Sequence, residues 1–344
     1  MTHPVRLTIL GAGRWGTHLV RNFLAHPQVK LVAVVDRQPA RLDQLREKFP
    51  LPDDLLLTTD WAAVNAAGDA VAIATPASTH YNLVKEALEA DLHVLVEKPL
   101  TLEPETSRQL CQLASDRGCY LMVDHTYLFH PAVQKGKQIV QSGTLGDWRY
   151  GYSARTHLGP VRQDVDALWD LAIHDLVIFN TWLGEKPSRV QAQGKNWLPA
   201  NGGSPQSDLV WVTLTYPSGM TVWIHLCWFN PDKQRRLCLL GSRGTLIFNE
   251  MLPQTPLTIQ RGYVEATSEG WQPAGQQQEV IEVPSAEPLK QVCDRFIAGV
   301  RGETGGTIST GWLGMELVET LTALTASLKQ QGKEMGIDAF SHTG

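Results

Sequence analysis

The chain has 344 residues, of which 43% are hydrophobic and 19% are charged, and its formal net charge is −5. This length exceeds the roughly 100–200 residues of a single core, so it predicts two domains. The composition excludes a nucleic acid as an expected partner, because phosphate binding needs a concentrated cationic surface and the sequence has no long basic stretch.

The cysteines and the apolar segments predict the cellular location of the protein. Five cysteines are scattered without CxxC spacing, which is typical of reduced thiols in a cytosol. The first residues lead directly into an expected strand, without the apolar region of a signal peptide. No apolar segment approaches the roughly 18 residues of a membrane span. We therefore expect a cytoplasmic protein that does not act on a membrane.

The first 125 residues alternate short apolar runs with helical stretches. Strands are expected at 5–11, 30–36, 69–76, 93–99 and 119–125, and the helices between them at 14–26, 39–49, 78–90 and 104–118. Apolar runs separated by helices indicate a parallel sheet covered on both faces. We therefore predict an α/β protein that begins with a doubly wound Rossmann domain over residues 1–123.

From about Thr126 the pattern becomes that of an α+β domain, predicted over residues 124–344. Helices are expected at 132–143, 166–184, 288–300 and 311–331, a strand at 148–156, and strand hairpins at 208–229 and 235–250. Strands in succession, with helices set apart, predict an antiparallel sheet. The stretch 253–275 carries glycines and prolines, so it is expected to be rich in loops. One option for the last helix is to pack back on the first domain.

The hairpin 208–229 has two different faces. Alternate residues form its apolar face, namely Val210, Val212, Leu214, Val222, Ile224 and Leu226. Trp211 and Trp223 fall on the opposite face, where solvent is expected. Two tryptophans on such a face predict that a second subunit covers it, in a homodimer or homotetramer. The alternative is that a helix from the tail covers this face.

A glycine motif follows the first expected strand. Gly11, Gly13 and Gly16 have GxGxxG spacing and precede a helix, which is the context of a dinucleotide site. The first glycine permits a tight turn, the second a close approach of the pyrophosphate, and the third close packing of helix on strand. The helix N-terminus then faces the phosphates. The alternative is a glycine-rich turn without a ligand.

Asp36 ends the next strand, 20 residues after Gly16. Its carboxylate is expected to accept hydrogen bonds from the adenosine ribose and to repel a 2′-phosphate, which favours NAD over NADP. Arg37 and Arg41 lie close enough in sequence to weaken this preference, so NADP stays possible.

Two later strands also end in polar residues. Thr75 and Pro76 end one of them and His80 follows one helical turn later, so a nucleotide across this sheet edge would pass near them. His80 could instead be a helix N-terminal histidine without a ligand. Lys98 ends the other strand, where it could hold a substrate hydroxyl or carbonyl and exchange its proton. Burial near a positive nicotinamide would lower the pKa of this lysine. The alternative is an ordinary surface lysine.

Asp170 and His174 stand four residues apart on one expected helix, so their side chains can touch. A carboxylate that fixes an imidazole is a usual arrangement for a general acid or base. Asp175 points elsewhere and is expected to be structural. The sequence offers no third ligand for a metal beside this pair, so no metal is expected.

In chain order, GxGxxG, the strand end ATPASTH (74–80), EKP (97–99) and DxxxH (170–174) resemble the motifs of the glucose–fructose oxidoreductase/inositol dehydrogenase/MocA (Gfo/Idh/MocA) family. The resemblance covers nearly the whole chain. It implies a dinucleotide-binding domain followed by a domain with a large, mostly antiparallel sheet, whose open face commonly forms subunit contacts. In relatives the peptide bond before the proline of EKP is often cis, so the resemblance also implies a cis bond before Pro99.

The motifs together define the expected site. The catalytic residues are expected to be Lys98, His174 and Asp170, because in the family the histidine or the lysine exchanges the hydroxyl proton while hydride passes between a sugar carbon and nicotinamide. The residues expected to bind the cofactor, NAD or possibly NADP, are Gly11, Gly13, Arg14, Trp15, Gly16, Asp36, Arg37, Thr75, Pro76, His80, Glu97 and Lys98.

Longer segments resemble family members associated with sugar-nucleotide oxidation, among them DHTYLFHPAV (124–133) and LWDLAIHDL (168–176). Ile173 and His18 depart from that subgroup, which usually has proline and asparagine there, so the substrate stays open. Candidate substrate contacts are Tyr127, Arg155 and Arg162, with His130, His157 and Asp164 as further candidates.

The main hypothesis is an NAD(P)-dependent oxidoreductase that acts on a secondary hydroxyl of a sugar, sugar nucleotide or cyclitol. One alternative is a cofactor-binding sensor without turnover, which would need neither Lys98 nor the Asp170–His174 pair. Another is a redox-neutral, NAD-dependent glycosidase.

Overall fold

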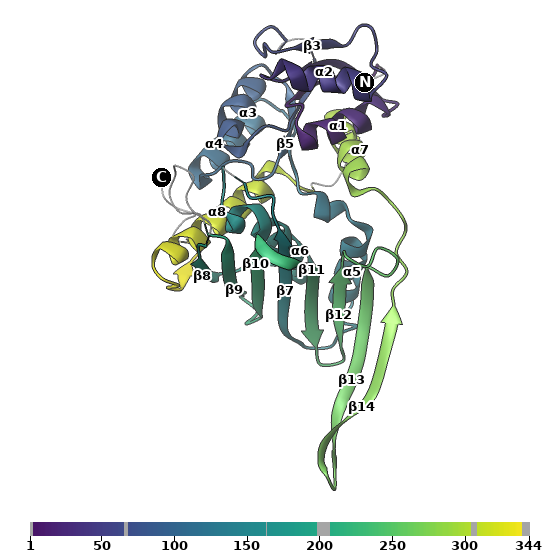
Figure 1. Ribbon diagram of the computed structural model, residues 1–344, viewed down its shortest axis with the longest axis vertical. Helices are drawn as coiled ribbons and strands as arrows, with labels where there is room; N and C mark the ends of the chain where they lie inside the picture. The colour runs from purple at the N-terminus through teal and green to yellow at the C-terminus, as the bar shows by residue number, and fades with distance from the viewer. Residues whose placement is uncertain (1–2, 65–67, 163, 198–206, 304–307, 339–344) are drawn as a thin grey trace. The chain divides into compact units, whose positions relative to one another are not determined.

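The computed structural model describes residues 3–64, 68–162, 164–197, 207–303 and 308–338, which form two compact units (Figure 1). The first unit holds the chain up to Phe129 together with residues 286–318. The second holds residues 130–285 and the chain from Glu319 onward. The two units are therefore discontinuous in sequence, whereas the predicted division into 1–123 and 124–344 is continuous and stays a prediction.

The first unit contains a six-stranded sheet in the order β3-β2-β1-β4-β5-β6, with all neighbouring strands parallel. Its strands are β1 (Val5–Leu10), β2 (Val29–Val35), β3 (Leu56–Thr58), β4 (Ala70–Ile73), β5 (His93–Glu97) and β6 (Leu121–Asp124). The apolar residues of β1 and β4 are almost fully buried, as their runs predict. This strand order confirms the Rossmann fold.

Five helices belong wholly to this unit: α1 (Arg14–Leu24), α2 (Pro39–Lys48), α3 (His80–Glu89), α4 (Pro104–Asp116) and α7 (Pro288–Val300). Helices α1 and α7 pack on each other. Arg21 of α1 forms an ion pair with Glu287, and His26 Nε2 lies 3.4 Å from Asp294 of α7. These contacts attach the later segment to the first unit.

The edge strand β6 is paired by the segment that precedes helix α8 (Gly311–Lys329). Val123 donates its N–H to the Ser309 carbonyl at 2.9 Å, and the Ser309 hydroxyl donates to the Val123 carbonyl at 2.6 Å. A Cβ at Gly314 would lie 2.7 Å from a Val123 methyl carbon, so glycine lets α8 approach the strand. Residues 309–314 thus satisfy backbone groups that a bare sheet edge would expose.

The second unit contains a nine-stranded sheet in the order β14-β13-β12-β11-β7-β10-β9-β8-β15. Its strands are β7 (Trp148–Leu158), β8 (Arg189–Lys195), β9 (Leu209–Thr215), β10 (Thr221–Cys227), β11 (Phe229–Gly241), β12 (Gly244–Asn249), β13 (Leu257–Thr267), β14 (Gly270–Val280) and β15 (Met335–Gly336). Neighbouring strands are antiparallel except β7 and β10, which are parallel. The mostly antiparallel sheet is confirmed, although β8 and β15 were not predicted.

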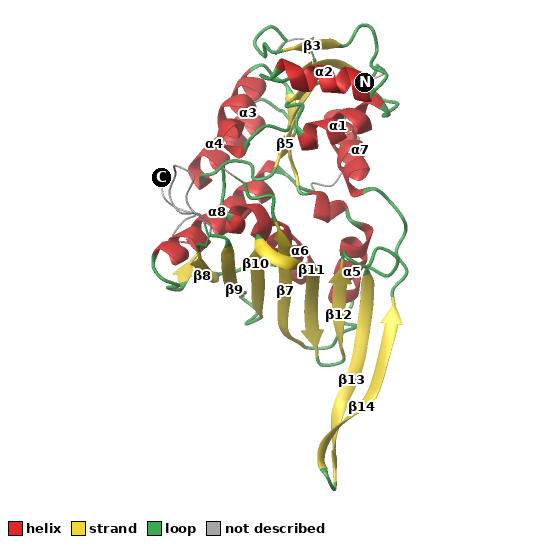
Figure 2. Ribbon diagram, in the orientation of Figure 1, coloured by secondary structure: helices red, strands yellow, loops and turns green. Residues whose placement is uncertain are grey.

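Helices α5 (Pro131–Gln141) and α6 (Ile173–Leu183) and the later part of α8 belong to this second unit (Figure 2). A Cβ at Gly151 of β7 would lie 3.0 Å from both Phe179 of α6 and Val222 of β10, so α6 packs on the apolar face of the hairpin. Among the described residues, no helix is long and apolar enough to cross a membrane. The cytoplasmic location stays a prediction.

The opposite face of the β9–β10 hairpin is open. Trp211 is 52% exposed and Trp223 is 45% exposed, while the six apolar residues of the other face are buried. The predicted separation of the two faces is therefore confirmed. Among the described residues, no helix covers the two tryptophans.

The expectation that 253–275 is rich in loops is wrong. The structure forms a long hairpin there, in which β13 pairs with β14 in an antiparallel register that shifts between Arg261 and Tyr263. The residues of β14 are exposed on both faces except Ala274, so its side chains show no alternation of apolar and polar character. A strand of this kind lacks the sequence signal that burial of one face would produce.

Candidate active site

The glycine turn lies between β1 and α1 in the first unit. Gly11 has φ 96°, and a Cβ there would lie 2.5 Å from the Ala74 carbonyl oxygen. A Cβ at Gly16 would lie 1.8 Å from the Gly11 carbonyl oxygen. Both glycines are therefore required by close approach of the backbone.

Gly13 differs from the other two glycines because it faces open space. The nearest described atom to a Cβ at this position would be Nη1 of Arg41, at 3.7 Å. Gly13 is the N-cap of α1, and no described side chain caps the helix there. The first N–H groups of a helix attract an anion, so this turn fits the phosphates of a dinucleotide. Arg14 and Trp15, in the first turn of α1, are exposed.

Asp36 lies beside the glycine turn and is 7% exposed. Its Oδ2 accepts the Ala12 N–H at 2.8 Å, and its Oδ1 accepts the Gln38 N–H at 2.9 Å. Nη1 of Arg41 lies 3.3 Å from Oδ2, whereas Arg37 is exposed. The carboxylate is thus fixed at the end of β2, where the ribose of a dinucleotide is expected, and Arg41 partly neutralises it.

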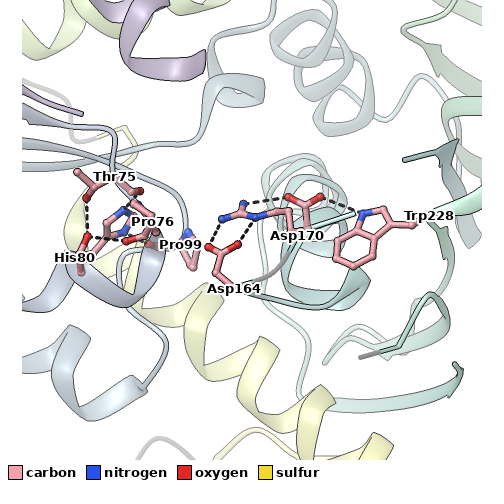
Figure 3. Close-up of polar contacts among 9 residues, drawn as sticks. Thr75, Pro76, His80, Pro99, Asp164, Asp170 and Trp228 are labelled. Atoms are coloured by element: carbon pink, nitrogen blue, oxygen red, sulfur yellow. Dashed lines mark hydrogen bonds and ion pairs between the residues drawn. The ribbon is translucent and has the colours of Figure 1, made fainter. Parts of the chain in front are cut away.

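The turn after β4 holds Thr75, Pro76 and His80. The hydroxyls of Thr75 and Thr79 lie 2.7 Å apart, and the Thr79 hydroxyl donates to the Pro76 carbonyl. His80 is 1% exposed. Its Nδ1 lies 2.8 Å from the Pro99 carbonyl oxygen and its Nε2 lies 3.0 Å from the Thr75 carbonyl oxygen (Figure 3). The structure shows a role for His80 inside the protein, and its contact with the cofactor stays a prediction.

Lys98 follows the last residue of β5, and both Lys98 and Glu97 are partly exposed. The peptide bond between Lys98 and Pro99 is cis, which confirms the expectation from the resemblance. Glu97 lies opposite Asp124 in the parallel register of β5 and β6. The strand ends therefore bring a lysine and two carboxyl groups to one edge of the sheet.

Asp124 and His125 were not predicted as site residues, yet both are buried beside Lys98. Burial raises the pKa of Asp124 to about 6, although hydrogen bonds from Thr126 and Glu97 and the Lys98 charge act against it. Burial, with the Lys98 charge in addition, lowers the pKa of His125 to about 3, so this imidazole is neutral at neutral pH. The signal that could have found both residues is their place at the end of a buried strand.

In the second unit, Asp170 lies in a π-helical turn, Leu168–Ala172, directly before α6. Its Oδ1 lies 3.2 Å from Nη1 of Arg162, and its Oδ2 accepts the Trp228 Nε1–H at 3.2 Å (Figure 3). Arg162 also donates two hydrogen bonds to Asp164, at 2.9 and 2.5 Å. Single π-helical turns are frequent at functional sites. His174 is partly exposed at the start of α6, and its pairing with Asp170 stays a prediction.

The other substrate candidates have different environments. Arg155 is 2% exposed and donates Nε–H and Nη2–H to Asp175, at 2.9 and 2.6 Å, which gives this pair a structural role. Burial lowers the pKa of His157, and the Asp170 charge raises it. His130 caps α5 by accepting the Ala132 N–H at 3.1 Å. Tyr127 is partly exposed in the first unit. Substrate contact stays a prediction for all of them.

The described residues contain no group of three His, Cys, Asp or Glu side chains that could hold a metal ion.

Comparison with known proteins defines the family. Residues 5–125 match an oxidoreductase family with an NAD-binding Rossmann fold, and residues 133–247 match the GFO/IDH/MocA C-terminal domain. The chain therefore belongs to the Gfo/Idh/MocA oxidoreductase family, and its first unit carries an NAD-binding Rossmann fold.

Individual relatives support this assignment. A solved structure from Magnetospirillum magnetotacticum, described as an oxidoreductase, is 30% identical with a TM-score of 0.79, covering 93% of this chain and 99% of that one. UDP-N-acetylglucosamine 3-dehydrogenase of Acidithiobacillus ferrooxidans is 33% identical over 61% of this chain, and the match spans 63% of that enzyme's length. An inositol dehydrogenase homologue from Azotobacter vinelandii, complexed with NADH and myo-inositol, shares the fold at 20% identity and a TM-score of 0.81, covering 98% of both chains.

Proposed function

We propose that the protein is an NAD(P)-dependent dehydrogenase that transfers hydride between nicotinamide and a secondary hydroxyl of a sugar, sugar nucleotide or cyclitol. The observation that carries this proposal is the position of Lys98. It ends β5 at the sheet edge where β1 ends in the glycine turn, and only β4 lies between these strands. The carboxyl edge of such a sheet is where ligands bind, so this cation is suited to hold a substrate oxygen.

Each proposed residue has a separate task. Bound NAD would supply the hydride acceptor or donor. Lys98 would hold and polarise the reacting oxygen, His174 would exchange its proton, and Asp170 would orient the imidazole. The relatives named UDP-N-acetylglucosamine 3-dehydrogenase and inositol dehydrogenase homologue support a hydroxyl of a sugar or cyclitol as the target.

Two finer points belong to the same proposal. Asp36 would make NAD the preferred cofactor over NADP, because its carboxylate repels a 2′-phosphate. A second copy of the chain would cover the open sheet face in a homodimer or homotetramer. Tyr150 lies 5.8 Å from Trp223 and Trp211 stacks on His225 at 4.2 Å between ring centroids, so this face carries a cluster of aromatic residues suited to an interface.

The test is absorbance of reduced nicotinamide, with NAD and NADP supplied separately and a panel of sugars, cyclitols and UDP-sugars. Lys98→Ala is expected to remove most turnover while the affinity for NAD stays nearly unchanged. Lys85→Ala is the matched control, because Lys85 lies on the surface of α3 in the same unit.

Other results would overturn the proposal. Equal loss of turnover and of NAD affinity in Lys98→Ala would refute the role of the lysine. If no substrate of the panel changes the absorbance of reduced nicotinamide while NAD is bound tightly, a sensor without turnover would be favoured. Glycoside hydrolysis without added cofactor would favour the redox-neutral glycosidase.

A further inference from the structure

One buried imidazole joins two turns at the carboxyl edge of the first sheet. Strands β4 and β5 are parallel neighbours, with Ile73 opposite Val96. The turn after β4 offers the Thr75 carbonyl, and the turn after β5 offers the Pro99 carbonyl. The ring of His80, 1% exposed, lies between these two oxygens at 3.0 and 2.8 Å (Figure 3).

The two contacts of this ring are not equivalent. A carbonyl oxygen only accepts a hydrogen bond, and a neutral imidazole carries one N–H. A neutral ring therefore donates to one of the two oxygens, and only a protonated ring donates to both. The shorter contact joins Nδ1 to Pro99. We therefore place an N–H on Nδ1, which donates to the Pro99 carbonyl.

The segment after Pro99 is held by a separate set of bonds. Thr101 is 2% exposed, and its hydroxyl lies 2.7 Å from both the Glu103 carbonyl and the Ser107 hydroxyl. These bonds fix the start of α4. On the other side, Glu97 is held in register by its place at the end of β5. Lys98 and Pro99 lie between these two fixed points, and the bond from His80 reaches the backbone in this interval.

We propose that His80 is a positioning residue, whose bond to the Pro99 carbonyl fixes the Lys98 backbone against the Thr75 turn. This inference rests on the proposed function, because it assigns His80 a task through Lys98. The imidazole does not touch the substrate in this assignment. It restricts the positions that the Lys98 backbone can adopt, and so the place of the ammonium group.

The test compares three variants of His80 in the full-length protein. His80→Asn keeps an N–H donor near the position of Nδ1, His80→Gln keeps one near Nε2, and His80→Ala keeps neither. Displacing a catalytic group by a fraction of an ångström to an ångström costs about 10–100-fold in rate, so kcat is expected to fall by that factor in His80→Ala and His80→Gln. His80→Asn is expected to retain most of kcat. Because both ring nitrogens face backbone oxygens, this assignment replaces the expected contact of His80 with the cofactor, and affinity for NAD is expected to change less than kcat in all three.

The matched control is His93→Gln, because His93 begins the same strand β5 at the other end. Its Nδ1 accepts the Tyr120 N–H at 2.8 Å, so the variant also loses a partly buried ring with one backbone bond. If kcat falls equally in His93→Gln and His80→Ala for the same loss of melting temperature, the effect is one of stability and the assignment is overturned. Equal kcat in His80→Asn and His80→Gln would also overturn it.

Hydrogen exchange gives a readout that does not need turnover. The backbone amides of residues 97–103, other than Pro99, are expected to exchange faster in His80→Ala than in the wild type or in His93→Gln. If the wild-type protein turns over no substrate but this difference is seen, the proposed function fails and the bond between His80 and the turn stands. If exchange of these amides is unchanged in His80→Ala, the positioning role is overturned whatever the enzyme does.

Discussion

At the scale of single residues, the first sheet gathers its polar side chains at strand ends. Asp124 is the last residue of β6, while Lys98 and His125 directly follow β5 and β6; Asp124 and His125 are almost fully buried. Burial disfavours the charged forms of both groups, so the carboxyl has a raised pKa and the imidazole a lowered one. The protonation states of the side chains at this sheet edge therefore depend on their burial in the fold as well as on their residue types.

The raised pKa of Asp124 makes a prediction about stability. The folded protein holds this proton up to a pH of about 6, whereas the ordinary aspartate pKa of 3.8 applies to the unfolded chain. Between these two pH values the folded state binds more protons than the unfolded state. The contribution of Asp124 to the free energy of unfolding is therefore fully present below pH 3.8 and is lost as pH rises through about 6. At 1.36 kcal/mol per pKa unit, the loss is at most about 3 kcal/mol.

Asp124→Asn removes this titration and checks it. The free energy of unfolding of the variant minus that of the wild type is expected to rise between about pH 4 and pH 6.5. Urea unfolding at several pH values measures this difference. Thr126→Val is the companion variant, because the Thr126 hydroxyl donates to Asp124 at 2.8 Å and its loss should move the transition to higher pH. A difference that stays flat across this range would contradict the raised pKa.

Asp36 makes a prediction about cofactor choice. Asp36→Asn removes the charge that repels a 2′-phosphate and frees Arg41, which lies 3.3 Å away. The ratio of kcat/KM for NADP to that for NAD is expected to rise about tenfold, the scale of one partly screened charge interaction. Arg41→Ala is expected to lower the same ratio. An unchanged ratio in Asp36→Asn would show that the carboxylate does not discriminate between the cofactors.

The positions of some candidate site residues were easier to predict from the sequence than those of others. The glycines, Asp36 and Lys98 stand at positions where a strand end and a helix start are both visible in the sequence. The partners of Asp170 were not predictable, because Arg162 is eight residues away and Trp228 is fifty-eight residues away, between β10 and β11. Asp124 and His125 were missed although the predicted strand 119–125 contains them, because their burial depends on neighbouring strands.

At the scale of elements, two glycines of the turn between β1 and α1 are expected to have different roles, Gly13 in cofactor binding and Gly16 in backbone packing. Gly13→Ala is expected to fold with nearly wild-type stability, since its φ is −70° and a Cβ there meets Arg41 at 3.7 Å. Its affinity for NAD is expected to fall, because the new methyl group occupies the space proposed for the phosphates. Gly16→Ala is expected to destabilise the protein by several kcal/mol, since its Cβ would lie 1.8 Å from a carbonyl oxygen.

Thermal unfolding and NAD titration of these two variants check the difference. If Gly13→Ala bound NAD as tightly as the wild type, the space above this residue would not be the phosphate site. If Gly16→Ala were as stable as the wild type, the backbone would have room that the structure does not show.

The elements that were predicted well are those in which burial of one face or of both faces produces a regular pattern of apolar residues in the sequence. The strands of the first sheet, other than β3, and the β9–β10 hairpin have apolar runs or alternation, and the structure has them within a few residues of the predicted bounds. The β13–β14 hairpin failed because exposed strands lack alternation, and Gly270 and Gly275, both with positive φ, read as loop residues. Short strands at the sheet edges, such as β3 and β15, contain too few residues to show an apolar run or an alternating pattern.

At the scale of the whole molecule, the open sheet face predicts self-association. Trp211→Glu together with Trp223→Glu is expected to shift the protein to a smaller species, because charges then replace two exposed aromatic residues. Sedimentation velocity measures the change. Leu56→Glu is the control, since Leu56 is 48% exposed on β3 of the other unit. A wild-type protein that sediments as a monomer would contradict the proposed interface.

The return of residues 286–318 to the first unit has a consequence for synthesis on the ribosome. Strands β1 to β6 emerge first, but α7 and the Ser309 segment emerge only after β7 to β14 have been made. Until then α1 lacks its partner helix and β6 presents an unpaired edge. The nucleotide-binding unit is thus one of the first parts to be translated and one of the last to be completed. Expression of residues 1–129 alone would leave these two surfaces uncovered permanently.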